Sequence, residues 1–253
     1  MEIVIPENTK KEIRIEEDKD IDLIIGENSE IKIIDTSKSN VNVNVKENAK
    51  VIYVTIKKDS SDSNKKAIVG KNGVMNWIEC CIGDNVNASV KTELNGEGSE
   101  TKTMSVIFGD KDNMLNIKNE VVHAASKSKS NMLTRVVLND RARAVYNGLV
   151  RVNPNSFGCE GYQKKETILL SEDARIEAVP NLEIENNDVK CSHGATISQI
   201  DDEKLFYLMS RGINEKDAKK AIVEGFFDPI LSIVDENLRD EIKEQISQRL
   251  GDI

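Results

Sequence analysis

The chain has 253 residues, which is enough for one large domain or two small ones with a substantial core. Only 4% of the residues are aromatic and 31% are charged, so the core must be built from Ile, Val, Leu and Ala, which favours thin, repetitive stacking over a thick sandwich. The net charge of -9 leaves no basic surplus for nonspecific nucleic-acid binding, and no apolar run approaches the roughly 18 residues of a membrane-spanning helix.

The cysteines and the N-terminus indicate a reducing compartment. Cys80, Cys81, Cys159 and Cys191 fit no compact disulfide framework, so we expect reduced thiols. The first residues also lack the basic and then apolar pattern of an export signal. We therefore predict a cytoplasmic protein.

A recurring pattern runs through residues 1–200, in which an Asn or Asp turn is followed by alternating apolar positions. The first turns, at Asn8, Asn28 and Asn48, are 20 residues apart, and later ones are wider and less regular. Segments such as Val41–Val45 alternate Val and Asn, which places one row of side chains inward. Repeats of this length with short strands predict a mainly β solenoid, a parallel β-helix, whereas a sandwich of short strands is the alternative.

Two polar segments within the repeats predict exposed loops rather than a domain boundary. They are Asp59–Lys66 and Ser126–Ser130, both rich in Ser, Lys or Asp.

The pattern changes at Asp201, and residues 201–253 predict a C-terminal helical segment. Asp201 or its neighbour caps a first helix that Gly212 closes, and Asn214 caps a second helix. Pro229 marks the start of a third.

Apolar residues recur every four positions in the last part of the chain and predict one long amphipathic helix. They are Ile230, Val234, Leu238, Ile242, Ile246 and Leu250. This stripe must be buried, either against the chain's own solenoid, where the helix would cap the last coil, or against another protein. The pattern fits both alternatives equally.

Cys191 and His193 are the clearest candidates in the sequence for side chains that bind a metal or cluster. In a strand the two side chains project from one face, and a thiolate beside an imidazole suits a soft or borderline metal, including iron in a cluster. Glu183 and Glu185, one strand earlier, are candidates for an added oxygen ligand. Two ligands do not close a tetrahedral site, but a two-fold dimer would supply the same pair again. The alternative is that Cys191 is simply a small buried hydrophobe.

The other cysteines carry weaker signals. Cys80 and Cys81 follow apolar strand residues, which favours burial, whereas Cys159 lies beside Gly158 and is expected to be exposed enough to react. The chain has no Walker A phosphate loop, no Gly-x-Ser-x-Gly elbow and no His-Glu-x-x-His pair. We therefore predict a protein that is not an enzyme and does not bind or hydrolyse ATP itself.

Six phrases occur in a fixed order over some eighty residues, from about 148 to 227. The phrases are Tyr146–Val150, Leu169–Ala174, Pro180–Ile184, Asp188–Thr196, Leu205–Ile213 and Ala218–Phe226. In that order they resemble the SufB/SufD family, the scaffold subunits of the SUF iron-sulfur cluster assembly system.

The resemblance implies a right-handed parallel β-helix followed by C-terminal helices that bind the ABC-type ATPase SufC. It also implies that two scaffold subunits pair along their β-helices and assemble a transient iron-sulfur cluster at the interface. Cys191 and His193 match the Lys-Cys-Ser-His-Gly phrase of D-type members. The partner-binding residues that we predict from the resemblance are Leu205, Phe206, Arg211, Ile222 and Phe226.

The chain departs from B-type members, which have a cysteine where this sequence has Ile184. Sulfur would then be accepted elsewhere, first at Cys191 and next at Cys159 or the Cys80–Cys81 pair. The alternative is a D-like platform that docks SufC and a second scaffold subunit without its own cluster. Because the sequence begins directly with strand-like residues, the resemblance implies a short form without the helical N-terminal region, and we expect a homodimer with two ATPase subunits.

Overall fold

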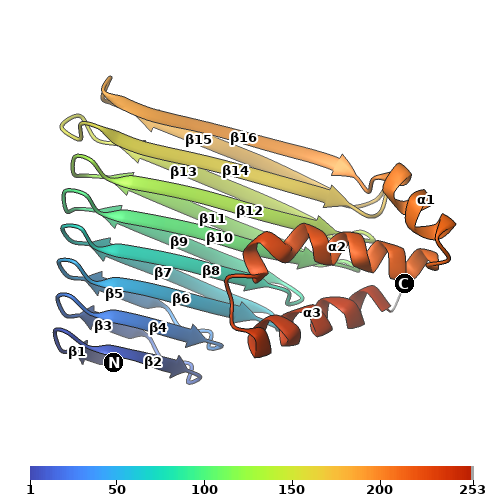
Figure 1. Ribbon diagram of the computed structural model, residues 1–253, viewed down its shortest axis with the longest axis horizontal. Coiled ribbons are helices and arrows are strands. Elements are labelled where there is room, and N and C mark those ends of the chain that lie inside the picture. The colour runs from blue at the N-terminus through green and yellow to red at the C-terminus, as the bar shows by residue number, and fades with distance from the viewer. Residues whose placement is uncertain (252–253) are drawn as a thin grey trace.

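The computed structural model describes residues 1–251, and in them the predicted mainly β solenoid is confirmed as a parallel β-helix (Figure 1). Successive strands alternate between two parallel sheets of eight strands each. The odd sheet contains β1 (Glu2–Ile5), β3 (Ile21–Ile25), β5 (Val41–Val45), β7 (Ser61–Val69), β9 (Val86–Leu94), β11 (Met114–His123), β13 (Arg143–Val152) and β15 (Arg175–Ile184). The even sheet contains β2 (Lys10–Ile15), β4 (Glu30–Asp35), β6 (Lys50–Lys57), β8 (Val74–Cys81), β10 (Glu100–Gly109), β12 (Lys129–Leu138), β14 (Cys159–Leu169) and β16 (Val189–Gln199).

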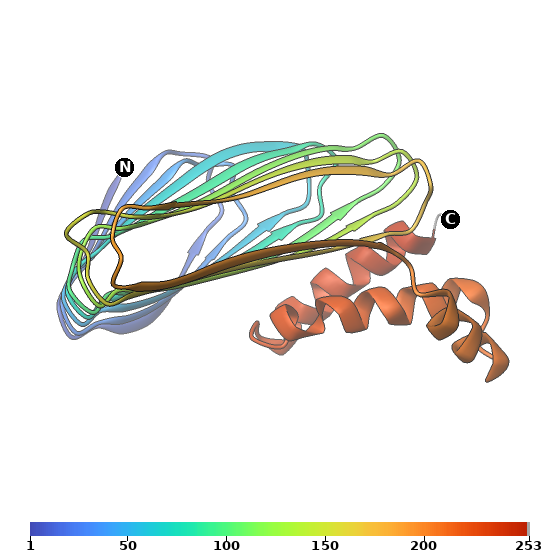
Figure 2. The ribbon, with the colours of Figure 1, turned by 90° about the horizontal axis from the view of Figure 1, so that it is seen from above.

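The coils lengthen from the N-terminal to the C-terminal end of the solenoid. The number of residues per coil is given by the separation of register partners in neighbouring strands of one sheet. It is 20 in the first coil, where Glu2 pairs with Asp22, and 32 in the last, where Arg143 pairs with Arg175. The strands grow accordingly, from 5 residues in β3 to 11 in β14. The later, wider turn spacing in the sequence therefore reflects longer strands within the same architecture (Figure 2).

The turns between odd and even strands stack as a ladder of asparagines. Asn8, Asn28, Asn48 and Asn72 all have positive φ, a conformation that Asn tolerates better than most residues. The amide of Asn48 donates to the side-chain oxygen of Asn28 at 3.2 Å, and Asn72 donates to Asn48 at 3.3 Å. Gly98 takes the same place in the next coil. The turns predicted at the first three positions are confirmed.

Apolar side chains fill the space between the two sheets in the N-terminal coils, where Trp77 and Tyr53 are the largest fully buried residues. Their rings are 5.0 Å apart between centroids. Trp77 Nε1 donates to Thr92 Oγ1 at 2.9 Å, so its polar atom is satisfied inside the core.

The prediction of a loop over Asp59–Lys66 is wrong, because Ser61–Val69 forms strand β7. Ser61, Ser63 and Lys65 alternate toward the interior and are buried. A polar strand is stable here because the interior supplies a polar partner, the carboxylate of Asp35. The segment at Ser126–Ser130 is a turn as far as Ser128, and β12 begins at Lys129.

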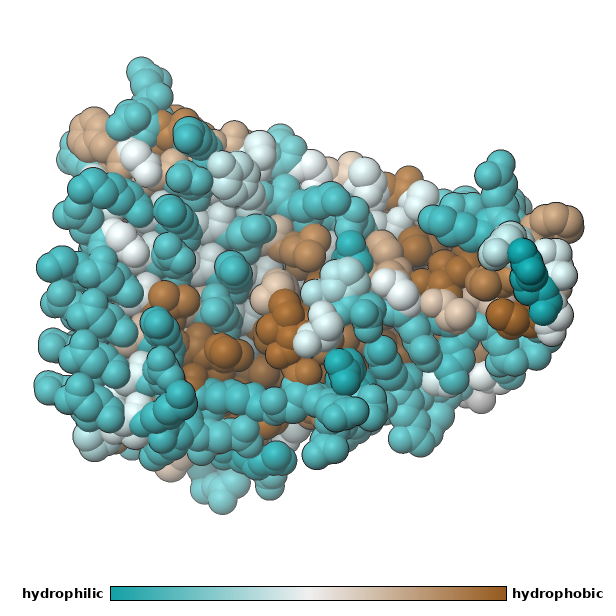
Figure 3. All heavy atoms as spheres, in the orientation of Figure 1, coloured by the Kyte–Doolittle hydropathy of each residue, from teal (hydrophilic) through white to brown (hydrophobic). Residues whose placement is uncertain are grey.

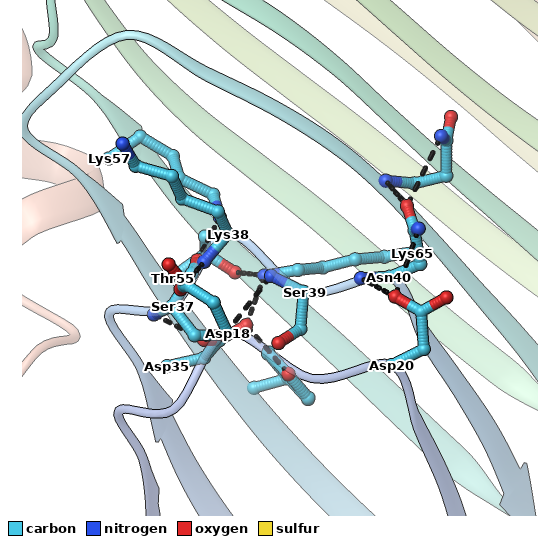
Figure 4. A network of polar contacts seen from close by, with 12 residues as sticks. Asp18, Asp20, Asp35, Ser37, Lys38, Ser39, Asn40, Thr55, Lys57 and Lys65 are labelled. Atoms are coloured by element: carbon cyan, nitrogen blue, oxygen red, sulfur yellow. Dashed lines mark hydrogen bonds and ion pairs between the residues drawn. The ribbon is translucent and has the colours of Figure 1, made fainter. Parts of the chain in front are cut away.

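A buried ion pair anchors that polar part of the interior (Figure 4). Lys65 Nζ lies 2.6 Å from Asp35 Oδ2 and donates to Thr55 Oγ1 at 2.6 Å. The hydroxyl of Tyr53 donates to the same carboxylate oxygen at 2.8 Å, and Ser37 donates to the other oxygen at 2.7 Å. The carboxylate is therefore paired and hydrogen-bonded on both oxygens, as a buried charge requires.

Three helices follow the solenoid in the described residues: α1 (Asp202–Ser210), α2 (Glu215–Leu231) and α3 (Glu236–Gly251). The predicted caps are confirmed, since the side chain of Asp201 accepts from the backbone N–H of Lys204 and that of Asn214 from Asp217. Gly212 has a φ of +89° after α1. None of the helices in residues 1–251 is long and apolar enough to cross a membrane.

The prediction of one long C-terminal helix is wrong, because the chain turns between α2 and α3, and Pro229 lies inside α2. The apolar stripe covers the outer face of the even sheet (Figures 1 and 2). The helical residues in this cluster are Val223, Phe227, Ile230, Leu231, Val234, Ile242, Ile246 and Leu250. Of the two alternatives, burial of the stripe against the chain's own solenoid is the correct one, but the helices cover the outer face of the even sheet and do not cap the last coil.

Charged contacts hold the α2–α3 hairpin on the sheet. Arg249 of α3 contacts Asp110 at 2.5 Å and Asp84 at 2.9 Å, and these two aspartates lie just after the C-terminal ends of β10 and β8. Arg135 of β12 donates to the carbonyl oxygen of Phe226 in α2, and its guanidinium lies 5.0 Å from the ring centre of that residue. The hairpin is therefore a fixed part of the solenoid's surface.

Candidate functional site

The last coil of the solenoid is open. β15 and β16 are the final strands of their sheets, so each has one edge without a partner strand in the described chain. Figure 2 looks onto this coil, and no other part of residues 1–251 lies over it. Most residues of β16 are exposed, in contrast to the buried alternate residues of β14 beneath it. An uncovered edge of this kind is a template for pairing with another chain.

Cys191 and His193 lie on β16 and face the interior at this open end. Their register partners in β14 are Gly161 and Gln163, which are buried inside the solenoid. His193 is exposed and Cys191 is partly buried. The structure therefore brings the predicted thiol and imidazole to one accessible face, as the alternation of strand side chains requires.

Gly161 provides the space in which the Cys191 thiol lies. A Cβ atom at position 161 would lie 3.3 Å from Cys191 Sγ, 3.4 Å from His123 Nε2 and 2.9 Å from a methyl group of Val150. Partial burial raises the pKa of Cys191, a hydrogen bond from the Gly161 backbone works against this, and nearby Cys159 adds to the rise. The thiol is thus held between the interior and the open end.

His123 and Cys159 form a hydrogen-bonded group directly beneath. The His123 ring nitrogens contact Ser128 Oγ at 2.7 Å and Ser130 Oγ at 2.8 Å, and Ser128 Oγ lies 3.3 Å from Cys159 Sγ. Burial lowers the pKa of His123 to about 4, so the imidazole is neutral at pH 7. The expectation that Cys159 is exposed is wrong, since inward alternation buries it completely. Its role as a sulfur acceptor stays a prediction.

Glu183 and Glu185 do not join the thiol and imidazole. Glu183 is the register partner of Arg151, and its carboxylate lies 2.6 Å from the guanidinium on the outer face of the odd sheet. Glu185 follows β15 and is exposed. In residues 1–251 no group of three His, Cys, Asp or Glu side chains is close enough to hold a metal ion. Of the four predicted cluster ligands, residues 1–251 of one chain therefore bring only Cys191 and His193 to the same face, and their role as ligands stays a prediction.

Cys80 and Cys81 point to opposite faces of β8, as their adjacent positions require. Cys80 belongs to the cluster between the even sheet and the helices, and Cys81 belongs to the interior. Burial raises the pKa of Cys80 to about 12 and raises that of Cys81 further. Both thiols are therefore protonated and shielded here, and their role as sulfur acceptors stays a prediction.

Sequence reasoning missed three polar residues of β14 that line the interior one layer below. Gln163, Lys165 and Thr167 alternate toward the inside and are buried. The sequence signal that could have identified them is the alternation of strand residues, which places them on the same face of β14 as Gly161. Gly161 is the register partner of Cys191.

The predicted partner-binding residues differ in whether they are accessible to a partner or packed against the chain's own sheet. Phe206 on α1 is 74% exposed, and Arg211 stacks on Tyr207 with 5.3 Å from guanidinium to ring centre. Leu205 and Ile222 are half-buried. Phe226, by contrast, packs against the chain's own sheet. Figure 3 shows apolar surface at the end of the molecule where α1 and α2 lie.

A groove runs between α1 and α2 next to these residues. Its lining combines apolar side chains with a charged rim and consists of Asp201, Glu203, Lys204, Tyr207, Leu208, Ala221 and Ile222. α1 itself has no buried residue. Exposed aromatic and apolar side chains on a helix without its own core contacts are typical of a protein-binding surface.

Comparison with known proteins identifies the same family as the sequence phrases. Residues 7–226 match the family model described as "SUF system FeS cluster assembly, SufBD core domain". The chain is 37% identical over 164 residues to the iron-sulfur cluster assembly protein SufD of Escherichia coli, covering 64% of this chain and 38% of the relative. It is 29% identical over 194 residues to an iron-sulfur cluster assembly SufBD family protein of Staphylococcus saprophyticus, covering 75% and 42%.

A third relative is a SufBD family protein of Mycobacterium bovis, 32% identical over 195 residues, with 75% of this chain and 23% of the relative covered. The chain thus spans less than half the length of these curated relatives. The match covers the β-helix from β2 onward, α1 and most of α2.

Proposed function

The chain belongs to the SufBD core family of SUF iron-sulfur cluster assembly proteins, and on that premise we propose that it is a scaffold on which a transient iron-sulfur cluster is built. The observation that supports this most strongly is the open last coil, which presents Cys191 and His193 at an accessible edge. The cluster is cargo, assembled and passed on. Anaerobic reconstitution with iron and sulfide tests the proposal.

A second copy of the chain completes the site in this proposal. The two ligands of one chain leave iron under-coordinated, and an isologous contact between two last coils adds the same pair again. The unpaired edges of β15 and β16 supply backbone groups for such a contact. Cys191 is partly exposed and His193 exposed, so neither side chain needs an unfolding step to reach a partner.

We further propose that α1 and the neighbouring part of α2 dock the ATPase SufC, so that this chain hydrolyses no ATP itself. Support comes from the exposed aromatic residues of α1 and the adjacent groove. The α2–α3 hairpin is fixed on the even sheet, so motion at α1 would reach the β-helix through Ile200, which links it to β16. All four thiols are free, which supports a cytoplasmic location.

Phe206→Glu is expected to weaken binding of purified SufC about tenfold or more, because exposed aromatic anchors often contribute 2 kcal/mol or more to an interface. Titration calorimetry with the full chain measures the affinity. Ile233→Glu is the matched control, since Ile233 is 51% exposed but lies at the α2–α3 turn. If the two variants bind SufC with equal affinity, α1 is not part of the docking surface.

A further inference from the structure

The first coil of the solenoid is open as well, at the end opposite the last coil (Figure 1). β1 and β2 are the first strands of their sheets, so each has one edge without a partner strand in residues 1–251. Between them lies a hollow of about 400 Å³, whose apolar lining includes Ile3, Ile13, Ile15 and Ile21. Ile3 and Ile13 are only partly buried, although they pack on the core. This end of the interior is therefore accessible to another chain.

The backbone of β2 offers every second residue to its free edge. The carbonyl oxygen of Ile15 accepts a hydrogen bond from the backbone N–H of Thr36, which directly follows β4. Successive strand residues direct their backbone groups to alternate sides, so the odd-numbered residues of β2 face β4. The N–H and C=O groups of the even-numbered residues, among them Glu12 and Arg14, therefore point to the free edge. The side chains of these two residues are exposed on the outer face of the sheet.

Charge distinguishes the registers in which two β2 strands could pair in antiparallel fashion. The free-edge residues must face one another, so a two-fold axis passes through a residue of β2. An axis at Glu12 pairs residues 10–14 and sets Glu12 opposite its own copy and Lys10 opposite Arg14, which are like charges. An axis at Ile13 pairs residues 11–15 and sets Glu12 opposite Arg14, with Lys10 opposite Glu16 at the ends. Only the second register makes every facing pair on the outer face complementary.

We propose that the first coils of two copies of this chain join edge to edge, with β2 antiparallel to β2 about Ile13. The two Ile13 side chains meet inside, where the apolar hollows of the two copies combine, and the oppositely charged side chains pair on the outer face. Charged residues on an edge strand usually keep other strands away, but this pattern is complementary to itself in one register. The contact uses neither Cys191 nor α1, so it is independent of the proposed function.

A thiol at position 13 tests the contact in the full chain. In a Cys191→Ser background the other three cysteines are buried, so Ile13→Cys supplies the accessible thiol. Because the backbone of Ile13 faces β4, the two facing residues form a non-hydrogen-bonded pair with Cα atoms about 4.5 Å apart, which is within the range of a disulfide. Mild oxidation is expected to give a covalent dimer linked through position 13.

Ile68→Cys in the same background is the control, because Ile68 is 44% exposed on the outer face of β7, away from either end of the solenoid. It is expected to stay monomeric under the same oxidation. A monomeric product from Ile13→Cys, or equal dimer yields from the two variants, overturns the proposal. The result does not depend on cluster formation or on SufC.

Charge reversal in the Ile13→Cys chain tests the register. Lys10→Glu sets like charges opposite each other in two pairs of the dimer and is expected to slow cross-linking through position 13 about tenfold. Glu16→Lys should do the same, and both changes together should restore the original rate, because each pair is then complementary again. A combined variant that is as slow as the single ones overturns the register.

Lys71→Glu is the matched control for charge reversal. Lys71, like Lys10, is exposed and pairs with a glutamate, but it lies in the turn between β7 and β8. It should leave the rate of cross-linking through position 13 unchanged. A control as slow as Lys10→Glu would show that net charge alone sets the rate and would overturn the paired edge.

Discussion

Asp35→Ala is expected to lower the free energy of unfolding by about 3–5 kcal/mol, the range for removing one partner of a buried ion pair. The change leaves Lys65, 1% exposed, as an uncompensated buried cation. It also removes the acceptor of the hydrogen bonds from Tyr53 and Ser37. Urea unfolding followed by far-ultraviolet circular dichroism measures the difference.

The matched control is Asp112→Ala, which removes a pair of similar geometry on the surface. Asp112 lies 2.7 Å from Arg141, and both side chains are exposed. Exposed pairs contribute about 0–1 kcal/mol, so the control should change stability little. Losses of similar size in the two variants would show that the buried pair has no special role.

The buried pair of Asp35 and Lys65 also predicts how the stability of the protein responds to acid. Burial alone would raise the pKa of Asp35, but the charge and hydrogen bond of Lys65, together with Ser37 and Tyr53, outweigh it and lower the pKa. A lowered folded-state pKa gives stability that is present above the unfolded value of about 3.9 and is lost as pH falls through the folded value. The wild type should therefore lose stability below about pH 4, and Asp35→Ala should lack that component.

Cys191→Ser and His193→Ala are each expected to abolish most of the cluster formed in anaerobic reconstitution. In the proposed site each chain contributes only these two ligands, so loss of either removes half of the protein ligands of the shared site. Visible absorbance, together with iron and sulfide content per dimer, measures the result.

Ser192→Ala is the control for that experiment. Ser192 lies between the two ligands on the same exposed strand but on the opposite face. It should retain the wild-type cluster content. A wild-type chain that forms no cluster under any condition would favour a structural platform for SufC instead, and unchanged clusters in the ligand variants would contradict the assignment of Cys191 and His193.

The turns and the alternation of strands could be predicted from sequence because both depend on local physics. Asn at positions 8, 28 and 48 tolerates positive φ, and alternating Val residues bury one face. The same local rule placed Cys191 and His193 on one face. It could not determine whether that face was covered, since this depends on where the last coil ends.

The errors arose where a distant partner decided the outcome. Asp59–Lys66 has the composition of a loop, yet Lys65 enters the interior because Asp35, thirty residues earlier, pairs with it. The C-terminal helical sequence would be amphipathic whether its apolar stripe packed on the chain's own solenoid or on another protein. Only its contacts with the even sheet show which surface it covers. Cys159 follows a glycine that suggested exposure, but the register of β14 directs the thiol inward.

Cross-linking of the native full chain through Cys191 most directly tests whether two last coils meet. Cys191 is the one cysteine of the chain that is not buried, so a short bismaleimide should react there first. We predict a covalent homodimer that mass spectrometry assigns to a Cys191–Cys191 link and that is absent in Cys191→Ser. Complete modification of Cys191 with only monomeric product would contradict a thiol–imidazole site shared between two copies.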